Sequence, residues 1–419
     1  MRLRPTRVLL AAGGGALLGA VVLAGATRLV LGSDWLLGEI DGNPDALFVT
    51  FTGSRASLVP GRLRFATVTV RSRDPNVEWE ARLRDVTLQV GLLALAGRRL
   101  HVSTLRAAAL SFRLRERLAA AETAPALLAR DPPIAGFPRV PLRDPRERRT
   151  PPGDPWEVDV DDLRVDRVRE VWIDSWRWAG GGSLAGGFHL RPGVEAEVVT
   201  SELGIENGVL TWGADVVSRG TRGRIRAALP KFATKAYPGN EVWRIVSGSA
   251  SLQGSLEAAP FLAPTKAGPR FPDGGSVRLE VAVSGARGDG RIAARLGDAR
   301  PLLALLPPGP GKWLAGFAGL RALEATGRLS GRPGLLAASP AHAESGTLSI
   351  DADLRKTPDG GWGAVLVRKG RVALGFGIGP GAASFHAVGA AAWFENEARP
   401  GGLRTDQPRA VVGAARPSR

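Results

Sequence analysis

The chain has 419 residues, 44% of them hydrophobic, which is enough apolar sequence for a large core and excludes wholesale disorder. It contains no Cys, and this excludes disulfides, thiolate metal sites and a cysteine nucleophile. The formal net charge of +16 favours anionic partners such as nucleic acid, acidic polymers or anionic lipid head groups, but it is also compatible with a merely soluble basic surface.

The N-terminus predicts a membrane anchor. Arg2, Arg4 and Arg7 precede an uncharged run over residues 8–27. About 20 apolar residues cross the hydrocarbon core as a helix, and arginine accumulates on the cytoplasmic side. We therefore expect an anchor within residues 1–32, a cytoplasmic N-terminus and everything after Arg28 on the far side. In a bacterium this means a single pass through the inner membrane, with the bulk of the chain in the periplasm.

A cleaved signal peptide is the alternative, because Ala24-Gly25-Ala26 is a fair small-residue cleavage site. Against cleavage, the apolar run is longer than the apolar core of a signal peptide, which usually has about 7–15 residues. Either reading exports the body of the chain. Export disfavours a nucleic-acid partner, and no basic stretch is interleaved with stacking aromatics.

Residues 33–118 predict a first β unit. Alternation of apolar and polar residues begins at Arg62 and changes phase at Ala66-Thr67. A second run over residues 77–90 changes phase at Asp85, as at a β-bulge, and a third covers residues 100–115. Three long amphipathic strands in succession favour an antiparallel sheet with one apolar face.

This apolar face is the candidate lipid-binding surface. A second sheet could close over it as a sandwich core, or the sheet could curl without closing and leave a trough for acyl chains. Each CH₂ moved from water into such a trough gains about 0.8 kcal/mol. Both arrangements need the same alternation. The expected inward-facing residues are Leu63, Phe65, Trp79, Leu83, Leu88, Phe112 and Leu114.

Residues 119–155 are rich in Pro and Arg and predict an exposed, extended loop or linker. Its arginines could contact anionic head groups, or it could be a solvated tether. Residues 156–395 return to β patterns and form a second β-rich region. We expect helix only at residues 298–306 and 312–320, strand again at 384–394, and a disordered tail over 396–419.

The sequence offers little chemistry, and we expect neither an enzyme nor a metal or cofactor site. The four histidines are far apart, which argues against zinc. Asp159, Asp161 and Asp162 could hold calcium, but the outward face of a strand explains them better. The glycine-rich run at residues 288–293 imitates a dinucleotide fingerprint, yet no helix of useful length follows it, so a hairpin turn is expected.

The order of these features resembles the bacterial AsmA-like and TamB-like proteins, in particular short, single-module members. The resemblance spans most of residues 8–395 and rests on the anchor followed by degenerate motifs. These are GSRASL (53–58), PG (60–61), VTV (68–70), DP (74–75), DVTL (85–88), the segment 92–100, ALEATG (322–327), SGT (345–347), GAVLV (363–367) and the closing residues 389–394.

The resemblance implies a mainly β protein: an elongated, curved antiparallel sheet, taco-like and built of repeating β-groove units, with an N-terminal transmembrane helix and a few short helices. It implies an inner-membrane-anchored periplasmic protein that binds phospholipid or another acyl-chain lipid. Phospholipid transport between the envelope membranes or outer-membrane homeostasis would be its role, with no catalytic residues and no cofactor. Roughly twenty strands at about 4.8 Å would span at most about 100 Å, too short for a full bridge by one copy.

Two other classes remain open. A structural or assembly protein of the envelope would have a closed β core and bind envelope proteins by strand addition at its sheet edges. An envelope enzyme acting on acidic glycans would need clustered carboxylates in a pocket, which the sequence does not show.

Overall fold

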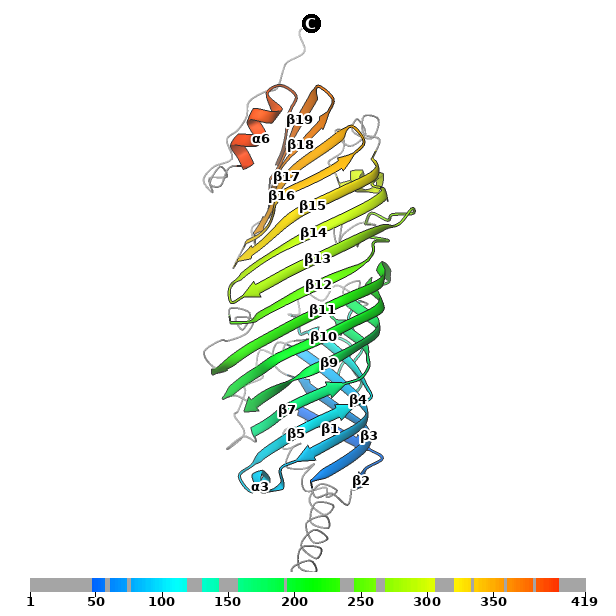
Figure 1. Cartoon of the computed structure of the whole chain (residues 1–419), viewed down its shortest axis with the longest axis vertical. Helices are drawn as coiled ribbons and strands as arrows, with labels where there is room; N and C mark the ends of the chain where they lie inside the picture. Colours follow the sequence, from blue (N-terminus) through cyan, green and yellow to red (C-terminus); the bar gives the residue numbers. More distant parts are fainter. Residues whose placement is uncertain are drawn as a thin grey trace, which may run out of the picture.

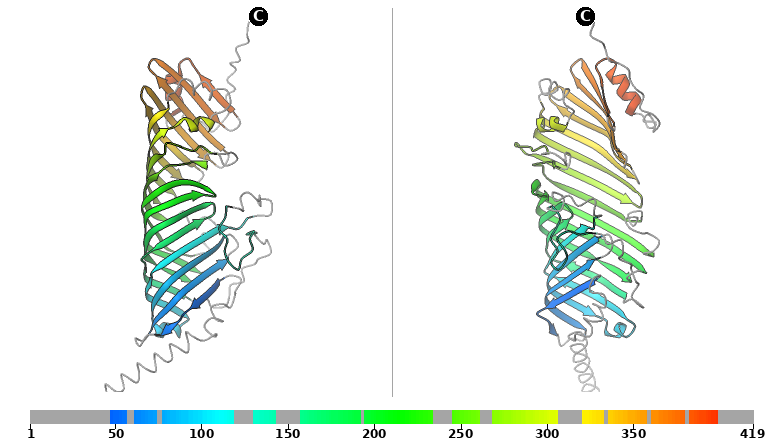
Figure 2. Two further views of the ribbon diagram at one scale, coloured as in Figure 1. Left: turned by 90° about the vertical axis from the view of Figure 1, so that its right-hand side faces the viewer. Right: turned by 180° about the vertical axis from the view of Figure 1, so that it is seen from behind.

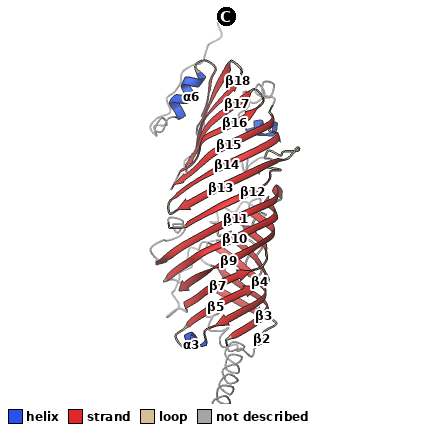
Figure 3. Ribbon diagram, viewed as in Figure 1, coloured by secondary structure: helices blue, strands red, loops and turns tan. Residues whose placement is uncertain are grey.

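The computed structural model describes residues 47–56, 61–73, 77–118, 130–142, 157–191, 194–233, 245–260, 268–305, 320–332, 335–357, 360–379 and 382–398. Within these residues, twenty strands form a single sheet. Figure 1 shows an elongated ladder of strands, and Figure 3 shows how little helix accompanies it. The expected mainly β class with one large sheet and few helices is confirmed.

The strands of the N-terminal part pair across a bend in the sheet. They are β1 (Leu47–Thr52), β2 (Arg55–Ala56), β3 (Arg62–Arg73), β4 (Val77–Val90), β5 (Arg99–Ala107), β6 (Ala109–Glu116), β7 (Glu157–Val165) and β8 (Val168–Ile173). β1 and β2 both pair with β3, and β3 pairs with β4. One end of β4 pairs with β5 and the other with β6, because the chain bends at Ala108 between them.

The remaining strands follow one another as a meander. They are β9 (Trp176–Arg191), β10 (Glu195–Trp212), β11 (Asp215–Ala233), β12 (Ser247–Ser255), β13 (Gly275–Ser284), β14 (Arg287–Asp298), β15 (Arg321–Arg332), β16 (Leu335–Ser345), β17 (Leu348–Thr357), β18 (Gly360–Lys369), β19 (Val372–Gly379) and β20 (Ala382–His386). Each is antiparallel to the next.

The sheet is not antiparallel throughout. β5 pairs with β7, and β6 with β8, in parallel. The chain between β6 and β7 is long enough to return to the end of the level where β5 begins, which the parallel pairing of β5 with β7 requires. The expected antiparallel arrangement holds for the other pairings of the described strands and is corrected only at these two. The alternating apolar pattern could not reveal the parallel pairings, because it is the same in both orientations.

Three pairs of strands share a level of the ladder: β1 with β2, β5 with β6, and β7 with β8. Twenty strands therefore occupy seventeen levels. At about 4.8 Å per level, the ladder measures roughly 77 Å perpendicular to its strands. It is shorter than the upper limit expected from the strand count alone.

The phase changes in β3 and β4 lie opposite each other. Phe65 pairs with Val86 and Thr67 with Arg84, while Ala66 and Asp85 form the one rung that is missing between them. Asp85 has a φ of 50°, which turns its strand over locally. Because both strands change phase at the same level, the apolar face continues and no extra residue is inserted. The expected change of phase is confirmed, but the register makes it a matched pair rather than a bulge.

Two hydrophobic cores lie at opposite ends of the ladder. The first gathers buried side chains from β3 to β10, among them Phe65, Val86, Val168 and Ile205. The second gathers buried side chains around β14 to β19, together with Ala259 and Phe271 from the chain before β13. Figure 2 shows that the sheet between these ends curves continuously about the long axis.

The helical segments differ from those expected. The predicted helix at residues 298–306 is a 3₁₀ helix, η5 (Arg300–Leu305), and residue 298 still belongs to β14. The strand predicted over 384–394 ends at His386 and is followed by the helix α6 (Ala390–Ala398), which also takes the first residues assigned to the tail. A further short helix, α3 (Leu92–Leu95), was not predicted. Residues 312–319 lie outside the described residues.

α6 packs on the face of β18 and β19 opposite the second core. The indole of Trp393 lies so close to Gly375 that a Cβ there would come within 2.5 Å of it. His386 stacks on the same indole at 4.2 Å between ring centroids. Leu366, which pairs with Gly375, is wholly buried. The ladder is therefore covered on both faces at this end.

The described part of the Pro/Arg-rich segment, residues 130–142, is not the exposed linker that composition predicts. Ile134 is 3% exposed, and Pro132 and Pro141 are wholly buried. The carbonyls of this segment accept hydrogen bonds from arginines at the end of β6. The Pro/Arg composition indicates the lack of regular structure but not this packing.

The predicted anchor, residues 1–32, lies outside the described residues. Among the helices of the described part of the chain, none is long and apolar enough to cross a membrane.

Candidate functional site: the apolar inner face of the sheet

The candidate site is one continuous face of the sheet. Residues paired across neighbouring strands lie on the same face, so the register traces that face from strand to strand. One such row begins at Ile205 on β10 and ends at Phe376 on β19. It comprises Ile205, Gly223, Leu252, Leu279, Ile292, Gly327, Ala341, Ala352, Val365 and Phe376. Every residue in this row is apolar or glycine.

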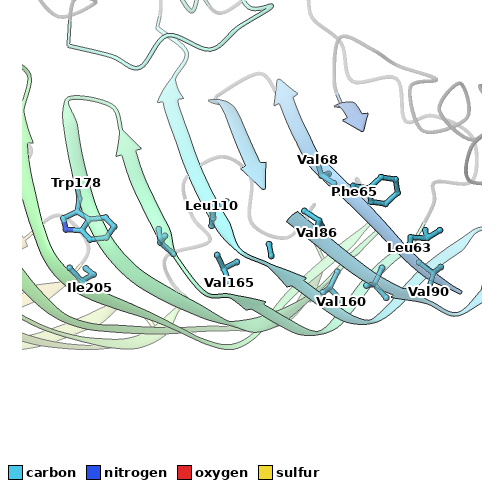
Figure 4. Packing of buried hydrophobic residues seen from close by; sticks show 13 residues of the cluster. Leu63, Phe65, Val68, Val86, Val90, Leu110, Val160, Val165, Trp178 and Ile205 are labelled. Atoms are coloured by element: carbon cyan, nitrogen blue, oxygen red, sulfur yellow. The ribbon is translucent and has the colours of Figure 1, made fainter. Parts of the chain in front are cut away.

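At the N-terminal end this face is filled by its own side chains. Figure 4 shows the buried residues of the first core on the inner side of the curved sheet. Val86, Val165 and Val168 are at most 2% exposed. Phe51 and Phe65 pack with their ring centroids 4.7 Å apart and their planes tilted by 32°. Here the inner face is a packed core.

The residues expected to face inward fall into two groups at the N-terminal end of the sheet, one in or against the first core and one further along the strands. Leu63 and Phe65 belong to the first core, and Leu83 and Leu88 pack against it. Trp79, Phe112 and Leu114 lie further along the strands and are half-buried, with Trp79 and Phe112 6.3 Å apart between ring centroids. All seven share one face, because their registers link Leu63 to Leu88, and Trp79 to Leu114.

Between the two cores the same face is open to solvent. Leu252, Leu279, Val281 and Ile292 on β12, β13 and β14 are all half-buried, and none of them reaches the burial of the core residues. We call these four residues the apolar strip. Leu252 packs against the edge of the first core. On β13 and β14 half-buried residues of this face alternate with mostly exposed residues of the other face. Such alternation is typical of an antiparallel sheet with one apolar face.

Sequence reasoning found β12 and β13 but did not single out the strip as a site. The hairpin turn expected at residues 288–293 is wrong, because these residues lie within β14 and the turn is at residues 285–286. The residues of the strip are ordinary alternating aliphatics, similar in type to those of the cores. Their exposure depends on what covers them, and that is set by parts of the chain far away in sequence. The described parts of the segments before β13 and β15 contribute Phe271 and Leu320 to the second core, and no residue of the strip belongs to that core.

A tryptophan marks the boundary between the first core and the strip. The ring of Trp178 on β9 lies over Gly180, Gly182 and Gly208, where side chains would collide with it. Gly182 pairs with Ile205, the first residue of the row described above. The glycines in these strands therefore make room for a large ring that closes the core on this side.

The outer face carries charged networks instead. Asp159 on β7 is bound by Arg99 on one side and by His189 on the other. His189 also contacts Glu195 at 3.0 Å through Nε2, and Lys231 lies 2.9 Å from the same carboxylate. Asp159 lies on the outward face of its strand as expected, but its side chain is only 8% exposed, because Arg99 and His189 bind it.

The charged groups of this network are paired with one another. Burial alone would raise the pKa of Asp159, but hydrogen bonds from His189 and Arg99 lower it below its ordinary value. The hydrogen bond to Asp159 in turn raises the pKa of His189. Glu157, Asp159 and His189 place ligand atoms within 4.8 Å of one another, as a metal site would. Arg99 already binds both carboxylates, so the donor set fits an ion-pair network better than a cation.

No protein-family model, curated protein or solved structure matches this chain.

Proposed function

We propose that this chain binds the acyl chains of a lipid along the inner face of its sheet, as a membrane-anchored protein of the bacterial envelope with its sheet in the periplasm. Its role would be phospholipid transport between the envelope membranes or maintenance of the outer membrane. The observation that carries this proposal is the unbroken apolar row from β10 to β19, with the apolar strip half-buried between two packed cores.

The physical argument is the cost of leaving such a face in water. Ten methylene groups transferred onto an apolar surface gain about 8 kcal/mol, before the entropy cost of ordering the chain is subtracted. A contiguous apolar face of this kind on a soluble domain marks an interaction surface. A groove open along its length accepts an acyl chain without requiring the sheet to unfold, and the taco-like groove suggested by the resemblance would serve this purpose.

Site-specific photocrosslinking tests the proposal with the full chain in its own membrane. Ile292 lies on the inner face of β14, and the exposed Ala293 beside it lies on the outer face. A photoreactive phenylalanine at Ile292 should yield lipid adducts detectable by mass spectrometry, and the same group at Ala293 should yield far fewer. Equal labelling at both positions would contradict a lipid-binding inner face.

Transport is tested with the matched pair Ile292→Asp and Ala293→Asp. The first places a charge in the path of an acyl chain, and the second adds the same charge to the outer face. We expect lipid exchange between donor and acceptor vesicles to fall at least tenfold for Ile292→Asp only. Because the chain has no Cys, a single cysteine at Ala293 also reports the side of the membrane through an impermeant thiol reagent.

One observation favours the second candidate, an assembly protein with a closed core. The first core fills the inner face at the N-terminal end, as a closed domain would. In this version partners add a strand at an edge of the sheet, such as β20, where Phe385 is 53% exposed. It predicts no lipid adducts at Ile292 and a protein partner captured by a crosslinker at Phe385.

A further inference from the structure

The outer face of the middle strands carries a hollow that the proposed lipid site does not use. Its volume is about 560 Å³, and it lies over β11 to β15, opposite the apolar strip. Its lining includes two serines and four arginines: Ser249, Ser251, Arg224, Arg226, Arg291 and Arg328. Polar and charged residues predominate in its lining, which also includes Ala250, Val281, Ala282 and Gly290.

The register brings these side chains into two neighbouring rows. In the first, Arg224 pairs with Ser251, Ser251 with Glu280, Glu280 with Arg291, and Arg291 with Arg328. In the second, Arg226 pairs with Ser249, and Asp289 follows two strands further on. Sequence inspection alone could not align arginines that lie about a hundred residues apart.

Two of the arginines lack a compensating negative charge among the described residues. Arg291 and Arg328 are directly opposite each other on adjacent strands, an arrangement of like charges that destabilises a sheet. Among the described residues, neither has an ion-pair partner. By contrast, Glu202 lies 2.8 Å from Arg224 and 2.6 Å from Arg226. Glu280 is already bound by Arg278 at 2.6 Å. The hollow therefore retains positive charge that the protein itself does not neutralise.

We propose that this hollow binds the phosphate ester of a polyhydroxyl compound, such as a glycerol phosphate, either free or as a lipid head group. Guanidinium groups bind phosphate through paired hydrogen bonds, and Arg291 and Arg328 supply two of them side by side. Ser249 and Ser251 can donate to the remaining phosphate oxygens. Glu280 and Asp289 can accept hydrogen bonds from ligand hydroxyl groups, which a bare anion would not offer.

This site is separate from the proposed acyl-chain site. A lipid whose tails lie on the apolar strip cannot place its head group here, because the sheet lies between the two. The inference therefore goes beyond the proposed function and does not depend on it. A head group bound here would belong to a second lipid, or to a bilayer surface against which the outer face rests.

Calorimetric titration of the full chain with sn-glycerol 3-phosphate and with inorganic phosphate tests the proposal. A parallel arm measures binding to phosphatidylcholine vesicles with and without phosphatidylglycerol. The double variant Arg291→Gln with Arg328→Gln should weaken binding at least tenfold. The charge-matched control, Arg287→Gln with Arg295→Gln, changes exposed arginines of the same strand that do not line the hollow and should bind as the wild type does.

The calorimetric and vesicle measurements distinguish a free phosphate ester from a lipid head group. Binding of glycerol phosphate alone identifies a free ester, and binding only to phosphatidylglycerol vesicles identifies a head group. No saturable binding by the wild type, equal binding by both double variants, or tighter binding of inorganic phosphate than of the ester would overturn the proposal. Arg291→Lys with Arg328→Lys keeps the charge and the fold and should still lose affinity. Ile292→Asp, on the inner face, should leave this binding unchanged even where it abolishes lipid exchange.

Discussion

Arg115 and Glu78 form an ion pair in which neither side chain is exposed. Two guanidinium nitrogens of Arg115 contact the same carboxylate oxygen, at 2.9 and 2.7 Å. Arg115 also donates to carbonyls of residues 132, 138 and 139, so the pair ties the end of β6 to the packed segment 130–142. Arg73 and Arg117 approach the second oxygen of Glu78 at 3.2 and 3.9 Å.

Removing the charge of Glu78 should therefore be costly, because it leaves three arginines without their shared counter-ion. Breaking a buried pair by removing one partner costs about 3–5 kcal/mol. We expect Glu78→Gln to lower the free energy of unfolding by about this amount, and urea denaturation measures it. The control is Glu80→Gln on the same strand, where Glu80 pairs with the partly exposed Arg71 at 2.9 Å. An equal, small effect for both variants would mean that the buried pair is not stabilising.

Gly208 is the second position where one substitution should matter. A Cβ added there would overlap the indole of Trp178, whereas at Gly181 the nearest atom would be 3.5 Å away, an ordinary contact. Overpacking a core costs about 1–3 kcal/mol. We expect Gly208→Ala to lower the urea midpoint and to change tryptophan fluorescence, and Gly181→Ala to do neither. If both variants unfold at the wild-type midpoint, the ring does not lie on these glycines.

Much of the local structure follows from the sequence. The phase changes at Ala66 and Asp85 locate the matched turnover of β3 and β4, since period-two alternation reports directly which face is buried. The parallel join of β5 with β7 does not follow, because it depends on where the chain between β6 and β7 leads. α6 was misread for a related reason. Ala390, Ala391 and Ala392 are apolar in any conformation, and only the packing of Trp393 on Gly375 distinguishes helix from strand here.

The candidate site, too, could be predicted only in part from the sequence. Alternation identifies apolar faces, but Leu63 in a packed core and Ile292 on the open strip have the same sequence signature. Which of them is exposed depends on the cores built by distant segments. The outer hollow requires the register of five strands, so no single stretch of sequence could indicate it.

Asp131 gives a pH dependence to the packed segment. Burial, followed by the nearby charge of Asp174, raises the pKa of Asp131 from 3.8 to about 6. The folded state then holds a proton that the unfolded state has released, so this residue lowers stability as the pH rises from about 4 to 6. A shift of this size corresponds to at most about 3 kcal/mol, and solvent contact reduces it. We expect Asp131→Asn to stabilise the protein at pH 7 and to have little effect at pH 4. Thermal unfolding at both values checks this, and an equal effect at both would contradict the raised pKa.

Trp393 should control the stability of the C-terminal end of the ladder alone. Its ring covers Gly375 and Gly377 on the outer face of β19, and Leu366 is wholly buried beside them. Truncation to alanine removes a large apolar contact, which costs about 3–5 kcal/mol at a fully buried site and less at this half-buried one. We expect Trp393→Ala to increase amide hydrogen exchange in β18, β19 and β20 and to leave β3 to β8 unchanged, because the two cores share no residues. Phe394→Ala, the neighbouring aromatic on α6, is the matched control. Uniform loss of protection along the whole ladder would instead show that the sheet unfolds as one cooperative unit.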